Sequence, residues 1–133
     1  MDNGELNKLM IQLSEDAVVF AKSEFGIELN HSLEDIGAVD LIIQRLKELD
    51  SVSLKNKELF TLSNVFGAYI GESIKNRIGG QWLYDLSDEF APASRLIVEN
   101  SDYPFASFFY QHLIGSPKVS VYEYALNALE RHL

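Results

Sequence analysis

The sequence predicts a helix-rich α+β fold of about five helices with a small two-stranded antiparallel hairpin, in the order helix, helix, helix, strand, strand, helix, helix. Apolar residues recur at three- and four-residue steps along most of the chain, which is typical of amphipathic helices. Between residues 81 and 98 the pattern changes to short alternating runs, which are typical of strands. The 133 residues contain no Pro/Gly/Ser-rich linker and no repeat, so we expect a single domain over residues 1–133.

The first two helices are expected in the N-terminal part of the chain. Residues 5–25 carry apolar side chains at helical spacing, and Gly26 is a natural stop. Ser32 is expected to cap the second helix, which ends near residue 50. Glu34 then lies in the first turn, where the positive end of the helix dipole favours a carboxylate.

A third helix and the hairpin are expected in the middle of the chain. The helix runs over residues 57–78, and the pair Gly79-Gly80 suits a left-handed C-terminal cap. Alternation over residues 81–86 predicts the first strand, and residues 96–98 predict its antiparallel partner.

Two further helices are expected at the C-terminal end. Ser101-Asp102-Tyr103-Pro104 is predicted to open the fourth helix, because proline is tolerated in a first helical turn, and this helix runs to about Leu113. The run Gly115-Ser116-Pro117 breaks it. The last helix is expected from Val119 or Ser120 to His132.

The composition excludes several classes of partner and site. The chain has 11 Lys and Arg against 20 Asp and Glu, a net charge of −9, which disfavours binding to nucleic acid and to anionic membranes. It has no cysteine, which excludes disulfides and thiolate ligands. No stretch approaches the roughly 20 apolar residues of a membrane span. The N-terminal residues lack the pattern of a secretory signal, so a cytoplasmic protein is expected.

The negative charge is uneven along the chain. Residues 1–50 hold 11 acids and 4 bases, a net of −7; residues 51–80 hold 2 acids and 4 bases, a net of +2; residues 81–133 hold 7 acids and 3 bases, a net of −4. Most of the acidity is therefore expected on the outer faces of the first two helices. Near the hairpin, Asp85, Asp88 and Glu89 form either a solvated turn or, with Glu99 and Asp102, a smaller acidic rim. These surfaces are predicted to attract a basic partner.

Two glycines stand out in the third helix. Gly67 and Gly71 lie four residues apart and therefore on one helix face, and each costs roughly 1 kcal/mol of helix propensity relative to alanine. The simplest compensation is close packing of this face against the first or the second helix. The alternative is a ligand that approaches the bare backbone.

A single carboxylate stands out on the same helix. Tyr69, Glu72 and Asn76 share roughly one face, where Glu72 falls between positions expected in the core. A carboxylate there needs hydrogen-bond donors, and the candidates are the Trp82 indole N–H, a tyrosine hydroxyl or backbone amides of the hairpin. Glu72 is expected to hold the helix to the hairpin. Two alternatives stay open: a site carboxylate that binds a cation or acts as a base, and simple exposure.

The segment Tyr69-Ile70-Gly71-Glu72, followed by Arg77 and then by Gly79-Gly80-Gln81-Trp82, resembles the motif Y-[LI]-G-E-x(4)-R-x-G-G-x-W. This motif belongs to a broad group of small uncharacterised bacterial proteins, some of which are encoded beside polymorphic toxins as immunity proteins. The resemblance covers residues 69–82 closely and the chain from about residue 30 to its end loosely. It implies an α+β fold and a bacterial source, it favours toxin neutralisation, and it carries no catalytic residues.

Catalytic, cofactor and metal sites are not predicted. The chain contains no H-E-x-x-H, G-x-S-x-G, P-loop or G-x-G-x-x-G pattern. His31 is expected beside a helix cap, His112 near a helix end and His132 beside the last residue, and none has a second histidine at ligand spacing. We therefore expect no enzymatic activity, no cofactor and no metal.

Aromatic residues are dense between Tyr103 and Tyr110. Most are expected in the core, but they cannot all face one way on a helix, so one or two are expected at the surface as anchors for a partner or a second copy. The candidate partner-binding residues are Asp85, Asp88, Glu89, Tyr103, Phe109 and Tyr110.

The favoured hypothesis is a small acidic interaction protein, an immunity protein that binds and occludes a basic toxin. One alternative is a small-ligand-binding or enzymatic domain, centred on the third helix and the hairpin. A homodimeric housekeeping module is the other. The ligand or enzyme site would be formed by Tyr69, Glu72, Asn76, Arg77 and Trp82.

Overall fold

The computed structural model describes residues 2–49, 56–87 and 92–133. In this part of the chain, five α-helices pack with a three-stranded antiparallel sheet, which confirms the helix-rich α+β class. The sequence analysis predicted two strands, and the structure has a third, β3 (Ser101–Tyr103). In chain order the elements are α1 (Asn3–Phe25), α2 (Leu33–Glu48), α3 (Asn56–Ile78), β1 (Gln81–Tyr84), β2 (Ser94–Val98), β3 (Ser101–Tyr103), α4 (Phe105–Ile114) and α5 (Val121–His132).

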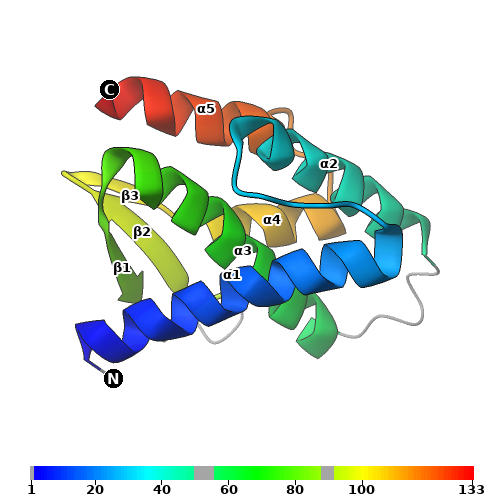
Figure 1. Ribbon diagram of the computed structural model, residues 1–133, viewed down its shortest axis with the longest axis horizontal. Helices are drawn as coiled ribbons and strands as arrows, with labels where there is room; N and C mark the ends of the chain where they lie inside the picture. The colour runs from blue at the N-terminus through cyan, green and yellow to red at the C-terminus, as the bar shows by residue number, and fades with distance from the viewer. Residues whose placement is uncertain (1, 50–55, 88–91) are drawn as a thin grey trace.

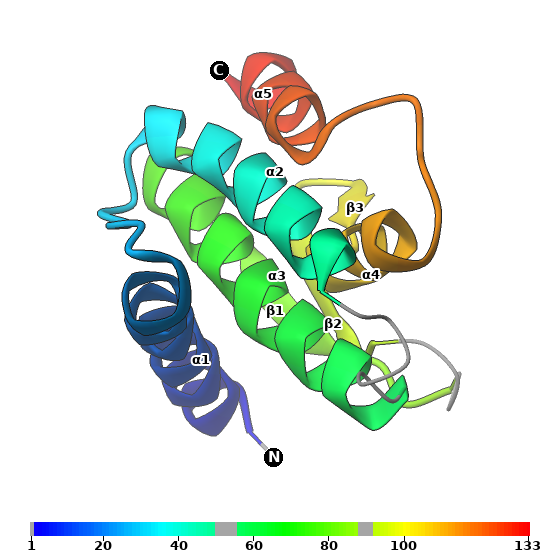
Figure 2. The ribbon, with the colours of Figure 1, turned by 90° about the vertical axis from the view of Figure 1, so that its right-hand side faces the viewer.

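Helix α3 lies at the centre of the molecule and contacts α1, α2, α4, α5 and β2. Figure 2 shows α3 between α1 on one side and α2 and α4 on the other. The sheet lies at one end, beside the N-terminal part of α1 and the C-terminal end of α3 (Figure 1). This central place explains why the middle of α3 is buried all round, although both of its ends carry charged residues.

Helix termini follow the expected capping chemistry. The Ser32 hydroxyl accepts a hydrogen bond from the Asp35 backbone N–H at 3.3 Å, so the predicted cap of α2 is confirmed. The expected stops are also confirmed: Gly26, which has a φ of 65°, is the C-cap of α1, and Gly79, which has a φ of 79°, directly follows the last residue of α3. The Gly79 N–H bonds the carbonyl of Lys75 at 2.9 Å and so closes the last turn.

A side chain of α2 caps α5. The two carboxylate oxygens of Asp40 accept hydrogen bonds from the backbone N–H groups of Val121, at 2.9 Å, and of Tyr122, at 3.0 Å. These N–H groups have no partner within their own helix, and the negative charge suits the helix N-terminus. Asp40 therefore ties α5 to α2 across a long separation in the sequence.

The sheet has the order β1-β2-β3, and both pairs are antiparallel. Trp82, Leu96 and Tyr103 face one another across the three strands, and all three are buried against the helices. The first strand is shorter than expected, since β1 ends at Tyr84 and Leu86 is exposed.

The prediction that a helix begins at Ser101 is wrong, because residues 101–103 form β3 and α4 begins at Phe105. Glu99, with a φ of 54°, lies in the short turn that returns the chain along β2. The residue before a proline is disfavoured in the helical region of φ and ψ, so the chain stays extended as far as Pro104. Pro104 then takes the N-cap position of α4.

Aromatic rings from three helices form the centre of the core. The ring of Phe66 on α3 stacks on that of Phe109 on α4, with centroids 5.1 Å apart, and meets Phe20 of α1 edge-on at 5.9 Å. Such pairs add to the free energy gained by burial alone. In the described part of the chain, no helix combines the length and the hydropathy that crossing a membrane requires.

Candidate functional site

Glu72 is held at the junction between α3 and the sheet. The Trp82 indole N–H donates a hydrogen bond to Glu72 Oε2 at 2.7 Å, so the first of the expected donors is the one used. Only 8% of Glu72 is exposed. A hydrogen bond to a carboxylate is stronger than one between neutral groups, and it offsets part of the cost of burying the charge.

The two glycines of α3 make room for close neighbours. A Cβ built on Gly71 would lie 2.1 Å from Cη2 of Trp82, and one built on Gly67 would lie 2.5 Å from Cα of Ala106 in α4. Close packing is therefore the reason for both glycines. The expected neighbours were wrong, however, because the face meets an indole ring and α4 and not α1 or α2.

His31 packs on the same end of α3. Its backbone N–H donates to the Tyr69 hydroxyl at 2.9 Å, and its Nδ1 lies 3.1 Å from Ser73 Oγ. The Ser73 hydroxyl itself donates to the Tyr69 carbonyl at 2.9 Å, so the contact requires the proton on His31 Nδ1. His31 has a φ of 65°, in the left-handed region, and its ring lies against that of Tyr69 with centroids 4.6 Å apart.

Burial sets the ionisation of this pair. It lowers the pKa of the His31 imidazole below its ordinary value of 6.5, although the carboxylates of Glu72 and Asp35 act in the opposite direction. Burial also raises the pKa of the Tyr69 hydroxyl to about 12. Both side chains are therefore neutral near neutral pH.

The residues expected in a ligand or enzyme site do not converge on one cavity. Tyr69, Glu72 and Trp82 are buried and hydrogen bonded to protein groups. Asn76 and Arg77 are exposed, and Arg77 donates to the carbonyl of Ser73 at 2.8 Å. Tyr69, Glu72 and Trp82 therefore act as structural groups where α3 meets the sheet.

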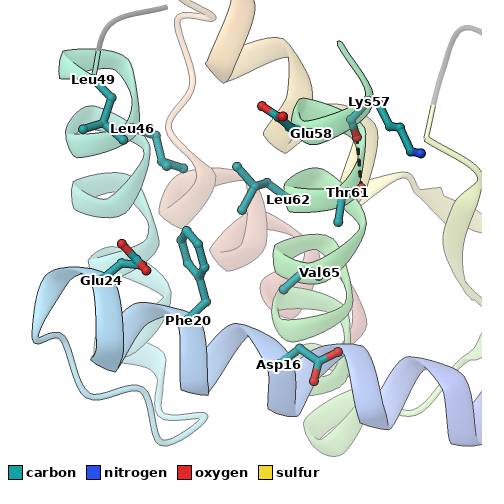
Figure 3. Close-up of a pocket in the computed structure, with 10 residues that line it drawn as sticks. All are labelled: Asp16, Phe20, Glu24, Leu46, Leu49, Lys57, Glu58, Thr61, Leu62 and Val65. Atoms are coloured by element: carbon teal, nitrogen blue, oxygen red, sulfur yellow. Dashed lines mark hydrogen bonds between the residues drawn. The ribbon is translucent and has the colours of Figure 1, made fainter. Parts of the chain in front are cut away.

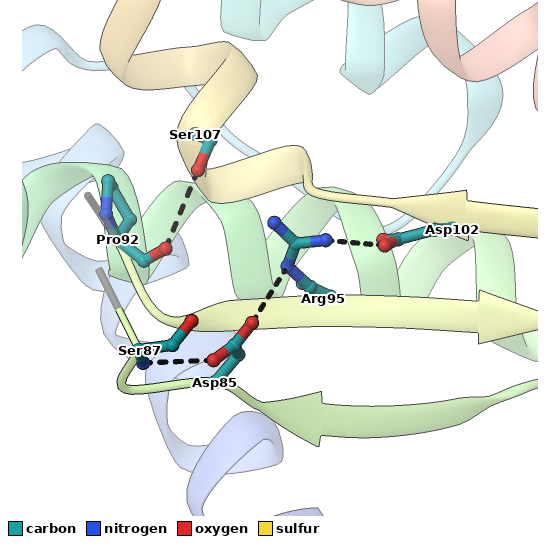
Figure 4. Close-up of polar contacts among 6 residues, drawn as sticks. All are labelled: Asp85, Ser87, Pro92, Arg95, Asp102 and Ser107. Carbon is teal, nitrogen blue, oxygen red and sulfur yellow. Dashed lines mark hydrogen bonds and ion pairs between the residues drawn. The ribbon is translucent and has the colours of Figure 1, made fainter.

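The acidic rim at the hairpin is partly neutralised. Arg95 lies between the carboxylates of Asp85, at 4.0 Å, and Asp102 (Figure 4). The Ser87 side chain and N–H bond Asp85 and lower the pKa of its carboxyl. The other two residues of the expected rim, Asp88 and Glu89, lie outside the described residues.

Two of the three candidate aromatic anchors are in the core. Tyr103 and Phe109 are buried, and Tyr103 shares a hydrogen bond of 2.7 Å with His132 Nε2. Only Tyr110 is half-buried, with its ring 4.9 Å from that of Phe60. Phe109 is covered because α4 turns it onto Phe66 of α3, and Tyr103 is covered because β3 turns it onto Phe105 of α4 and Tyr124 of α5.

A groove that the sequence analysis did not identify opens between α1, α2 and α3 (Figure 3). Its volume is about 740 Å³. Its apolar lining comes from all three helices, and four charged residues and one threonine complete it. The lining residues are Asp16, Phe20, Glu24, Leu46, Leu49, Lys57, Glu58, Thr61, Leu62 and Val65.

One sequence signal for this groove was available. Asp16, Phe20 and Glu24 are spaced four apart, which places an aromatic residue between two carboxylates along one row of the first helix. Leu49 follows the last turn of α2, and 48% of it is exposed. No sequence pattern shows that this row on α1 faces the lining residues of α3, because that depends on how the helices pack.

The described residues contain no group of three or more His, Asp or Glu side chains with the geometry of a metal site. In comparisons with protein-family models, with curated proteins and with solved structures, the chain matches none.

Proposed function

We propose that this chain is a small acidic interaction protein, which binds a basic protein and covers that protein's working surface. The observation that supports this proposal best is the groove between α1, α2 and α3, where apolar side chains lie open beside carboxylates. Apolar side chains in a groove can accept apolar side chains of a partner, and the acidic border favours a positively charged one.

The charge of the whole chain supports the same class of partner. A net charge of −9 attracts a basic protein from a distance and so increases the rate of encounter. On α1 and α2, six carboxylates are exposed against four Lys or Arg side chains. Among the described residues that line the groove, three are acidic, Asp16, Glu24 and Glu58, and one is basic, Lys57.

A toxin with a basic substrate-binding cleft is the partner that we favour. The motif between Tyr69 and Trp82 resembles that of small bacterial proteins encoded beside toxins, and a basic cleft is complementary to this chain in charge. Neutralisation would then follow from steric and electrostatic occlusion of the toxin's cleft.

Co-expression with the protein encoded by the neighbouring gene tests this proposal. We expect growth to be protected and the two purified proteins to form a complex. The association rate should fall as NaCl rises from about 0.01 M to about 1 M, because the Debye length shrinks from about 30 Å to about 3 Å. A neighbour that stays toxic and forms no complex would refute the proposal.

Variants in which exposed carboxylates are replaced by neutral amides test the role of charge more sharply. Glu15→Gln combined with Glu48→Gln removes two exposed carboxylates from α1 and α2. We expect the association rate at low salt to fall about threefold or more, because electrostatic steering weakens. Glu123→Gln combined with Glu130→Gln makes the same change in net charge on α5 and should have the smaller effect.

A further inference from the structure

The groove has two long walls and one end wall. Asp16, Phe20 and Glu24 form the wall on α1, and their four-residue spacing places them in one row. The wall on α3 extends from Glu58 to Val65, and α2 closes the end with Leu46 and Leu49. Seven residues of helix rise about 10 Å, so the α3 wall is about as long as two turns of a helix.

The floor of the groove is apolar. Figure 3 shows Phe20 and Leu62 pointing into the space between the helices, with Leu46 and Val65 beside them. Phe20 is fixed by edge-on contacts with Phe25 and Phe66, so the floor is built on the core and does not depend on surface side chains alone. The free energy gained by covering such apolar surface is about 25 cal/mol for each Å² removed from water.

The border of the groove carries a net negative charge. Asp16 and Glu24 are exposed on the α1 side, and among the described residues of the lining α3 adds one acid, Glu58, and one base, Lys57. An occupant must therefore combine apolar side chains for the floor with positive charges for the border. A second copy of this acidic chain would bring like charges together and is disfavoured.

We infer that this groove receives a short basic amphipathic helix of the partner protein. Two or three large apolar side chains at positions i, i+3 or i+4, and i+7 would fill the space between α1 and α3, and flanking Lys or Arg side chains would pair with Asp16 and Glu24. This inference rests on the proposed function, and it names the surface and the partner's chemistry.

A synthetic peptide tests the inference directly. The probe is a fluorescein-labelled peptide of about 14 residues, with leucine at the i, i+4 and i+7 positions and mostly lysine elsewhere. We expect its fluorescence anisotropy to rise on titration with this protein. A scrambled peptide of identical composition should bind about tenfold more weakly, because its leucines no longer share one helix face.

Groove variants locate the binding surface. Leu49→Lys and Thr61→Trp alter the lining at two positions that are exposed, so the fold should tolerate both. Each should weaken peptide binding about tenfold, the first by charge repulsion and the second by filling the groove. The matched controls Leu41→Lys and Gln44→Trp make the same kinds of change at exposed positions of α2 outside the lining and should stay within about twofold.

Three results would overturn the inference. The peptide and its scrambled form could bind equally, the lining variants and their controls could behave alike, or no binding could be detected. None of these contradicts the proposed function, since the neighbouring gene's product could still form a complex through another surface. Conversely, the peptide could bind as expected while the neighbouring gene's product forms no complex. That result would support the groove as a binding site and refute the proposal that the neighbour is the partner.

Discussion

The indole N–H of Trp82 donates to Oε2 of Glu72 over 2.7 Å, and both side chains are buried where α3 enters the sheet. This one hydrogen bond joins the central helix to the first strand. The indole ring also lies on Gly71, one residue before Glu72, so the ring is fixed by packing and by its polar atom together. The stability of this junction can be tested from both sides.

Replacing Glu72 should destabilise the protein. Glu72→Leu leaves the buried indole N–H without an acceptor and should reduce the free energy of unfolding by about 1–3 kcal/mol in urea denaturation. Glu72→Gln keeps a carbonyl oxygen and should cost less. Trp82→Phe, combined with Glu72→Leu in a double-mutant cycle, should show favourable coupling between the two side chains. If Glu72→Leu leaves the melting temperature unchanged, Glu72 has no structural role at this junction.

Gly71→Ala and Gly37→Ala should have opposite effects. Both glycines lie inside helices, where alanine gains roughly 1 kcal/mol of helix propensity. At Gly71 a Cβ would lie 2.1 Å from Trp82, so overpacking should give a net loss of about 1–3 kcal/mol. At Gly37 the nearest atom, in Tyr122, is 3.8 Å away, so the substitution should stabilise the protein. Urea denaturation of the two variants measures the contrast.

The stability of the protein should fall on acidification through the titration of His31. Burial lowers the pKa of the folded imidazole below 6.5, so the unfolded chain binds the proton first. The contribution of neutral His31 is therefore complete above about pH 6.5 and is lost as the pH falls through the folded pKa. His31→Asn, which tolerates the positive φ, should show a smaller stability loss between about pH 7.5 and pH 5. If the original protein and His31→Asn lose the same stability over this pH range, the titration of His31 is not the cause.

Removing the Asp40 carboxylate should loosen α5. Asp40→Ala leaves the N–H groups of Val121 and Tyr122 without their acceptors and should cost about 0.5–2 kcal/mol. The amides of α5 should then exchange with deuterium faster than those of α3. Ser120→Ala removes only the local cap to Glu123 and is the matched control, with an effect at the lower end of the same range.

Local chemistry was sufficient to place most elements. Apolar periodicity located the helices, and Ser32, Gly26 and Gly79 marked their ends, because capping depends on residues a few positions apart. The third strand was missed because Ser101 and Pro104 look like the start of a helix. The deciding facts are the turn at Glu99, where a residue other than glycine takes a φ of 54°, and the local pairing of Val98 with Ser101 that this turn allows. A glycine or Asn-Gly signal at the turn would have announced the hairpin, and the sequence has none there.

The sequence by itself determined the acidic character of the chain, its helical pattern, and the need of Glu72 for a donor, since charge and periodicity are properties of the residues in order. Only the tertiary structure decided which donor serves Glu72, which neighbours the glycines admit, and that Tyr103 and Phe109 are buried. It alone brings the row from Asp16 to Glu24 opposite the row from Glu58 to Val65. The physical reason is that a groove is the space left between helices, and its shape depends on packing angles that no single helix contains.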